Sequence, residues 1–81
     1  MKIVKIIWRD ALAEGGRWMD EDELDDFADD DSQFLVSSVG YELRKTKDYI
    51  TLMQNHCLEN NFGGNLIKIP RRWIVEYTEL K

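Results

Sequence analysis

The sequence contains few of the residues that reactive sites and covalent frameworks usually require. There is one cysteine, Cys57, one histidine, His56, and one proline, Pro70, in 81 residues. A single cysteine excludes an internal disulfide framework and favours a reducing compartment. Because His56 and Cys57 are adjacent, a strand would point them to opposite faces, which excludes a local nucleophile–base pair. A zinc site built from the usual cysteine and histidine ligands is not expected either.

Long apolar runs are also missing. The longest runs, such as Ile6–Trp8, span three residues, far fewer than the ~20 that a membrane-spanning helix needs. Met1 is followed directly by a strand-like segment, so we expect no signal peptide. Hydrophobic residues make up 43% of the chain, which is typical of a folded protein. These features predict one small cytoplasmic domain, near the lower size limit for a core that is stable alone.

Acidic residues are abundant, but they are concentrated in one place. The segment Asp20–Asp31 reads DEDELDDFADDD, and nine of its twelve residues are acidic. The other 69 residues carry 7 acidic and 11 basic side chains, which is a net charge of +4, whereas the whole chain has −5. The sequence is therefore a mildly basic domain with one intensely acidic insert.

The acidic run has the pattern of a short helix. Leu24 and Phe27, three residues apart, define one apolar face. Asp20, with Glu23 three residues later, is close to a capping box and predicts where the helix begins. Acidic residues at the far end oppose the helix dipole, so we expect about two turns that fray by Asp29. We expect Leu24 and Phe27 to hold this helix against the rest of the domain.

Five other segments have the composition of β-strands. They are 2–10, 33–45, 48–59, 66–69 and 73–80, with a loop at 60–65 and a helical turn after Pro70. Gly15 and Gly16 break the chain after the first strand, and Gly40 indicates a bulge, a sharp bend or a close backbone approach. This order predicts a mainly β protein, a small five-stranded bent sheet or barrel of the Src-homology-3 or Sm type. The acidic helical insert, at about 18–31, lies between the first two strands.

A set of short motifs runs along most of the chain. They are Trp8-x-Asp10-Ala11, Gly16-Arg17-Trp18, Ser38-Val39-Gly40-Tyr41, Asp48-Tyr49-Ile50-Thr51-Leu52, Ile69-Pro70, Ile74 and Glu79-Leu80. In this order they resemble a widespread set of small uncharacterised proteins encoded by tailed bacteriophages. The resemblance implies a phage origin and expression in a bacterial cytoplasm, and it implies no established activity. The acidic run is denser here than in that pattern.

The charge density of the acidic run is close to that of nucleic acid. A helix of twelve residues rises ~18 Å and would carry about one charge per 2 Å, whereas duplex DNA carries one per ~1.7 Å. Such a helix can occupy a basic groove on a host protein, with fast and salt-sensitive binding. The alternative is a solvated insert that keeps the protein soluble or docks on its own basic side. The predicted partner-binding residues are Trp18, Asp20, Glu21, Asp22, Glu23, Asp25, Asp26, Asp29, Asp30 and Asp31.

The aromatic and basic residues outside the insert have a second interpretation. Trp8 and Trp73 fit core and rim packing, whereas Trp18 lies in the loop and is expected to be exposed. Two basic clusters, Arg44, Lys45 and Lys47 and then Lys68, Arg71 and Arg72, have the aromatic residues Tyr41, Tyr49 and Trp73 nearby in sequence. Cations beside aromatic rings are typical of single-strand nucleic-acid surfaces. The pI of about 4.7 argues against direct nucleic-acid binding.

Neither a metal site nor a catalytic site is predicted. An EF-hand loop is excluded because Leu24 takes the place of the third ligand and no glycine follows. We find no activated nucleophile or acid–base pair, so we expect neither an enzyme nor a cofactor. The leading hypothesis is a non-enzymatic inhibitor that mimics nucleic acid toward a basic host protein. Two alternatives are an assembly module that forms an oligomeric barrel and a nucleotide- or oligonucleotide-binding small barrel.

Overall fold

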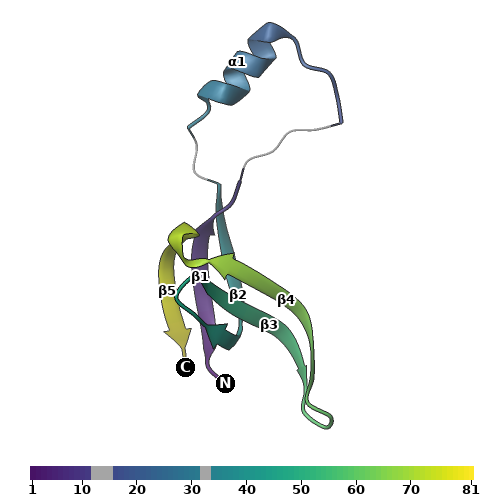
Figure 1. Ribbon diagram of the computed structural model, residues 1–81, viewed down its shortest axis with the longest axis vertical. Helices are drawn as coiled ribbons and strands as arrows, with labels where there is room; N and C mark the ends of the chain where they lie inside the picture. The colour runs from purple at the N-terminus through teal and green to yellow at the C-terminus, as the bar shows by residue number, and fades with distance from the viewer. Residues whose placement is uncertain (12–15, 32–33) are drawn as a thin grey trace.

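The fold is one bent sheet of five antiparallel strands, in the order β4-β3-β2-β1-β5 (Figure 1). A computed structural model describes residues 1–11, 16–31 and 34–81; Gly15 and Gln33, predicted at a chain break and a strand start, lie outside this range. The elements are β1 (Ile3–Arg9), α1 (Glu21–Asp29), β2 (Leu35–Lys45), β3 (Tyr49–Cys57), β4 (Phe62–Pro70), the 3₁₀ turn η1 (Arg71–Trp73) and β5 (Ile74–Leu80). The predicted class, mainly β with one helix between the first two strands, is confirmed.

The core lies on one face of the sheet. Alternate residues of β1 point into it, and Ile6 is completely buried. The buried cluster draws on three strands and consists of Val4, Ile6, Trp8, Ile50, Leu52 and Ile69. Trp73 of η1 stacks on Trp8, with ring centroids 6.4 Å apart and an interplanar angle of 14°. Trp8 is therefore a core residue, and Trp73 lies at the rim of the core.

The strand β2 is shared between two partners, and this sharing bends the sheet. Its first part, Leu35–Tyr41, pairs with β1, and its last part, from Tyr41 onward, pairs with β3. Gly40 lies at the change of partner, where an added Cβ would stand 3.0 Å from the carbonyl oxygen of Met53. The predicted close backbone approach at Gly40 is therefore confirmed.

The sheet does not close into a barrel. The β2–β3 ladder ends at the pair Tyr41 and Met53, whereas β4 pairs with β3 along its whole length. The far part of the β3–β4 hairpin therefore extends beyond the other strands (Figure 1). In the described part of the chain no ladder joins β4 to β5. Of the two predicted alternatives, the barrel is wrong, because this hairpin diverges from β5 instead of curling toward it.

The turn between β3 and β4 is shorter than predicted. The strand β4 begins at Phe62, within the segment predicted as a loop over 60–65. Asn61 adopts a positive φ of 60°, and Asn60 Oδ1 accepts a hydrogen bond from the Phe62 backbone N–H. These two asparagines reverse the chain, so the following glycines are free to belong to the strand.

A second, smaller set of contacts outside the core cluster supports the hairpin. Met53 is buried at 4% exposure, and its sulfur occupies the space that a side chain at Gly63 would need. The rings of Tyr41 and His56 meet edge to face with centroids 6.2 Å apart. His56 Nε2 lies 2.6 Å from Asn61 Oδ1. His56 therefore has a packing role within the hairpin.

A hydrogen bond links two distant strands at the edge of the core. The Tyr77 hydroxyl of β5 donates to Glu42 Oε1 of β2 at 2.6 Å. Lys45 Nζ lies 4.3 Å from the centroid of the Tyr77 ring. The hydrogen bond to Glu42, partial burial and the negative charges of Glu42 and Glu79 raise the pKa of Tyr77 from 10.0 to about 12.

Replacing Gly40 by alanine should lower the free energy of unfolding by about 1–3 kcal/mol, because the new Cβ would press on the Met53 carbonyl oxygen. Gly64→Ala is the matched control, since no described atom comes within 4 Å of its added Cβ, and it should stay within about 0.5 kcal/mol. Urea unfolding followed by tryptophan fluorescence measures both changes. Equal effects of the two substitutions would contradict the close approach.

The raised pKa of Tyr77 should make the fold lose stability in strong alkali. The folded state holds the phenolic proton more tightly than the unfolded state, so the stabilisation is complete below pH 10 and is lost as the pH rises to about 12. Tyrosinate absorbance should show one tyrosine that ionises later than the others. Glu42→Gln should lower the pKa of Tyr77 and shift the loss of stability to lower pH; an unchanged titration would exclude Glu42 as the cause.

Candidate functional site

The candidate site is an arm, residues 16–31, that leaves the sheet between β1 and β2; we call it the acidic arm. The backbone N–H of Asp10 donates to the carbonyl oxygen of Phe34 at 2.8 Å, so the chain departs and returns at one point of the sheet. Figure 1 shows α1 beyond the end of the sheet and apart from all five strands. The helix contains no buried residue. The acidic arm therefore presents all sides of α1 to its surroundings.

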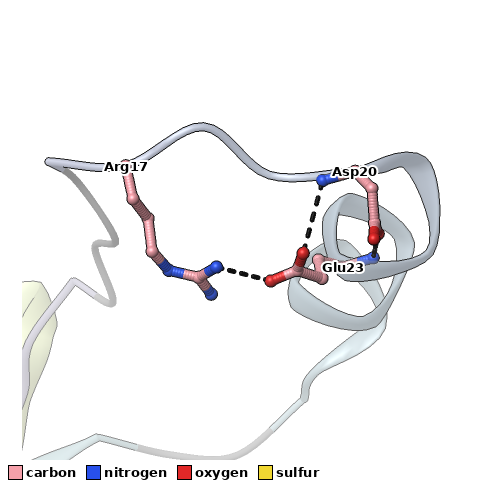
Figure 2. Close-up of polar contacts among 3 residues, drawn as sticks. All are labelled: Arg17, Asp20 and Glu23. Carbon is pink, nitrogen blue, oxygen red and sulfur yellow. Dashed lines mark hydrogen bonds and ion pairs between the residues drawn. The ribbon is translucent and has the colours of Figure 1, made fainter.

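The start of α1 is defined by the predicted capping box (Figure 2). Asp20 has an extended backbone, and its Oδ1 accepts a hydrogen bond from the Glu23 backbone N–H at 2.9 Å. In return, Glu23 Oε1 accepts from the Asp20 backbone N–H at 3.4 Å. The other oxygen of Glu23 lies 2.5 Å from Arg17 Nη1. Because that ion pair is exposed and stabilises little, the cap is the main local reason that the helix begins here.

The helix has one acidic face and one apolar face. Successive residues of an α-helix are rotated by ~100°, which places residues three and four apart on the same side. Five carboxylates share one side of α1: Glu21, Asp22, Asp25, Asp26 and Asp29. Leu24, Phe27 and Ala28 occupy the other side. The charged and the apolar side chains therefore lie on opposite sides of the same helix.

The apolar face of α1 does not pack on the sheet, so that part of the prediction is wrong. Leu24 is 54% exposed and Phe27 is 38% exposed. Trp73 already stacks on Trp8 at the rim of the core. Burying the pair would also bring the neighbouring carboxylates toward a low-dielectric interior, which is costly. That density of charge is the signal in the sequence that could have indicated an exposed pair.

The structure brings the predicted site residues together on the acidic arm. Trp18 is fully exposed, as expected for its place in the loop before the helix. Asp20 caps the helix, the helix carries six carboxylates, and Asp30 and Asp31 follow it. Acidic side chains in the first turn favour the helix dipole, whereas Asp29 opposes it and no basic residue offsets this in the last turn. A nine-residue helix without buried side chains is marginal alone, so its persistence depends on the cap.

Within residues 1–11, 16–31 and 34–81, no group of three or more histidine, cysteine, aspartate and glutamate side chains is arranged to hold a metal ion. Cys57 is a free, exposed thiol. None of the described helices is long and apolar enough to cross a membrane.

Comparison of the chain with models of protein families, with curated proteins and with solved structures found no match.

Replacing Asp20 by alanine should unwind much of α1, because loss of an N-cap costs about 0.5–2 kcal/mol and no tertiary packing compensates. Asp20→Asn removes the same charge but keeps a capping oxygen, so it is the matched control and should keep the helix. Cα chemical shifts of residues 21–29 measure helix content, and the stability of the sheet should not change in either variant. Equal loss of helix in both variants would show that charge, not capping, holds α1.

Proposed function

We propose that this protein is a non-enzymatic, phage-encoded binding protein that acts in the cytoplasm of a bacterial host. Its acidic arm engages a basic, nucleic-acid-binding surface of a host protein and blocks that surface, as an inhibitor or nucleic-acid mimic. One observation carries the proposal: α1 stands clear of the sheet with both its acidic and its apolar faces exposed.

The spacing of charge on α1 supports mimicry of nucleic acid. Six carboxylates lie within the nine residues of the helix, which rises ~14 Å in all. This is about one charge per 2 Å, close to the one per ~1.7 Å of a DNA duplex. A groove lined with lysine and arginine to hold phosphates offers these carboxylates the same pairing. Binding there would also relieve the repulsion among the carboxylates of the arm.

The apolar side chains favour a docking arm over a merely solvated one. A segment that only keeps a protein soluble has no use for exposed apolar residues, yet Trp18, Leu24 and Phe27 are 100%, 54% and 38% exposed. Tryptophan is the residue most often found at the energetic centre of protein interfaces. Exposed ion pairs contribute little individually. We therefore assign steering and orientation to the carboxylates and most of the binding energy to the apolar residues.

Neutralising the acidic face should abolish capture of the partner. The variant Asp25→Asn, Asp26→Asn, Asp29→Asn leaves the cap and the Arg17 ion pair intact, and it should reduce recovery of a host protein from bacterial lysate at least about tenfold, because steering and pairing by fixed charges are lost. Glu59→Gln, Glu76→Gln, Glu79→Gln is the matched control, with the same charge change outside the arm. Both variants should keep the wild-type unfolding curve.

The salt dependence and the apolar variant complete this test. Capture of the partner by the wild type should weaken at high salt, as expected for contacts between charged surfaces. Trp18→Ala should weaken capture at all salt concentrations, because apolar burial is not screened. Capture that survives charge neutralisation would contradict the proposal. The absence of any partner, together with a ring-sized oligomer, would instead favour the assembly module.

A further inference from the structure

Two basic clusters that are distant in sequence meet at one end of the sheet. The Arg71 backbone N–H donates to the carbonyl oxygen of Asp48 at 2.9 Å, and Arg71 Nη1 donates to the carbonyl oxygen of Thr46 at 3.0 Å. These bonds tie η1 to the turn between β2 and β3. A cleft of about 300 Å³ lies here, and its lining residues are Lys47, Asp48, Tyr49, Pro70, Arg71 and Arg72.

The cleft is positively charged. Three cations and one carboxylate line it, and Lys68 adds a further cation, with Nζ 5.6 Å from the centroid of the Tyr49 ring. Among the residues that the structure describes, neither Lys47 nor Arg72 forms an ion pair with a carboxylate. Arg71 is fixed by its bond to Thr46, which orients its guanidinium in advance. A group of this kind favours an anion with several oxygens, since guanidinium forks pair with phosphate in a bidentate manner.

An aromatic ring lies within the same positive environment. Tyr49 is 43% exposed and lines the cleft. Nucleic-acid bases stack on exposed aromatic rings without regard to their identity, and such rings beside a positive groove are the usual arrangement for binding single strands. An acidic peptide would use the cations but would leave the ring unused. Phosphate and base together use both features.

We propose that this cleft binds a nucleotide unit, with its phosphate held by Lys47, Arg71 and Arg72 and its base against Tyr49. The unit belongs either to a free nucleotide or to single-stranded nucleic acid. The low pI of the chain is an average over two regions that the structure separates, because α1 stands apart from the sheet and the residues outside Asp20–Asp31 carry a net charge of +4. This inference does not depend on the proposed function of the acidic arm.

The test measures the fluorescence anisotropy of a fluorescein-labelled oligothymidylate titrated with the full chain. The double variant Lys47→Ala, Arg72→Ala should weaken binding at least about tenfold. It should also reduce the slope of log K against log salt concentration by about 1–2. Tyr49→Leu, which keeps an apolar side chain, should weaken binding about fivefold or more. Lys2→Ala, Lys81→Ala is the matched control, because it removes two exposed cations outside the cleft, and it should bind like the wild type. Arg71 is left intact, since its bonds hold the turn.

Competition experiments identify the source of the nucleotide. Displacement of the oligonucleotide by thymidine monophosphate, but not by inorganic phosphate, supports a site for free nucleotides; displacement only by unlabelled oligonucleotide supports a site for single strands. The variant with Asp25, Asp26 and Asp29 changed to asparagine should retain this binding, which separates failure of the cleft from failure of the arm. No binding at low salt, or equal loss in the Lys2, Lys81 control, would overturn the proposal. A last outcome is that the protein binds no nucleotide but self-associates, and that the double variant Lys47→Ala, Arg72→Ala abolishes the self-association. That result would assign the cleft to the acidic arm of a second copy and would also overturn the proposal.

Discussion

The contact between Gly40 and the Met53 carbonyl oxygen is the constraint on which the rest of the sheet depends. At this point β2 leaves β1 and joins β3, and a Cβ at position 40 would crowd the carbonyl oxygen of Met53 at 3.0 Å. The resulting bend directs the core side chains of β1 and β3 into one cluster. It also sends the β3–β4 hairpin away from β5, which leaves the sheet open.

The molecule separates its charges in space as well as in sequence. The carboxylates of the acidic arm lie on a helix that contributes nothing to the core, whereas Lys47, Arg71 and Arg72 surround a cleft on the sheet. Had the arm folded onto the sheet, these two sets would have neutralised each other, and neither would be available to a ligand. An extended molecule, 55 Å along its longest axis, preserves two surfaces of opposite sign.

The features that could be predicted from the sequence are those decided by near neighbours. The capping box joins Asp20 and Glu23, which are only three positions apart, and the exposure of Trp18 follows from its place in a loop. The features that could not be predicted depend on distant contacts. Closure of the sheet depends on where the β2–β3 ladder ends. The packing of Leu24 and Phe27 was mispredicted because an apolar pair indicates a face, not the surface that covers it.

The basic cleft also depends on distant contacts, so the sequence did not predict it. Lys47 and Arg72 were recognisable as members of two clusters, but their convergence depends on the hydrogen bonds from Arg71 to Thr46 and Asp48. Those bonds connect residues more than twenty positions apart, and no local sequence pattern predicts them. The number of strands was therefore easier to predict than the site that the strands create.

The common point of departure and return of the acidic arm has a mechanical consequence. The arm is attached at the hydrogen bond between Asp10 and Phe34, next to the pair Arg9 and Leu35, where the antiparallel β1–β2 ladder begins. Tension applied across the two ends of the arm would therefore load this ladder one rung at a time, as in a zipper, and not all rungs together. Force delivered through a partner bound to the arm as a whole would instead pull both ends in the same direction, so it would load β1 and β2 together and would not separate the two strands from each other.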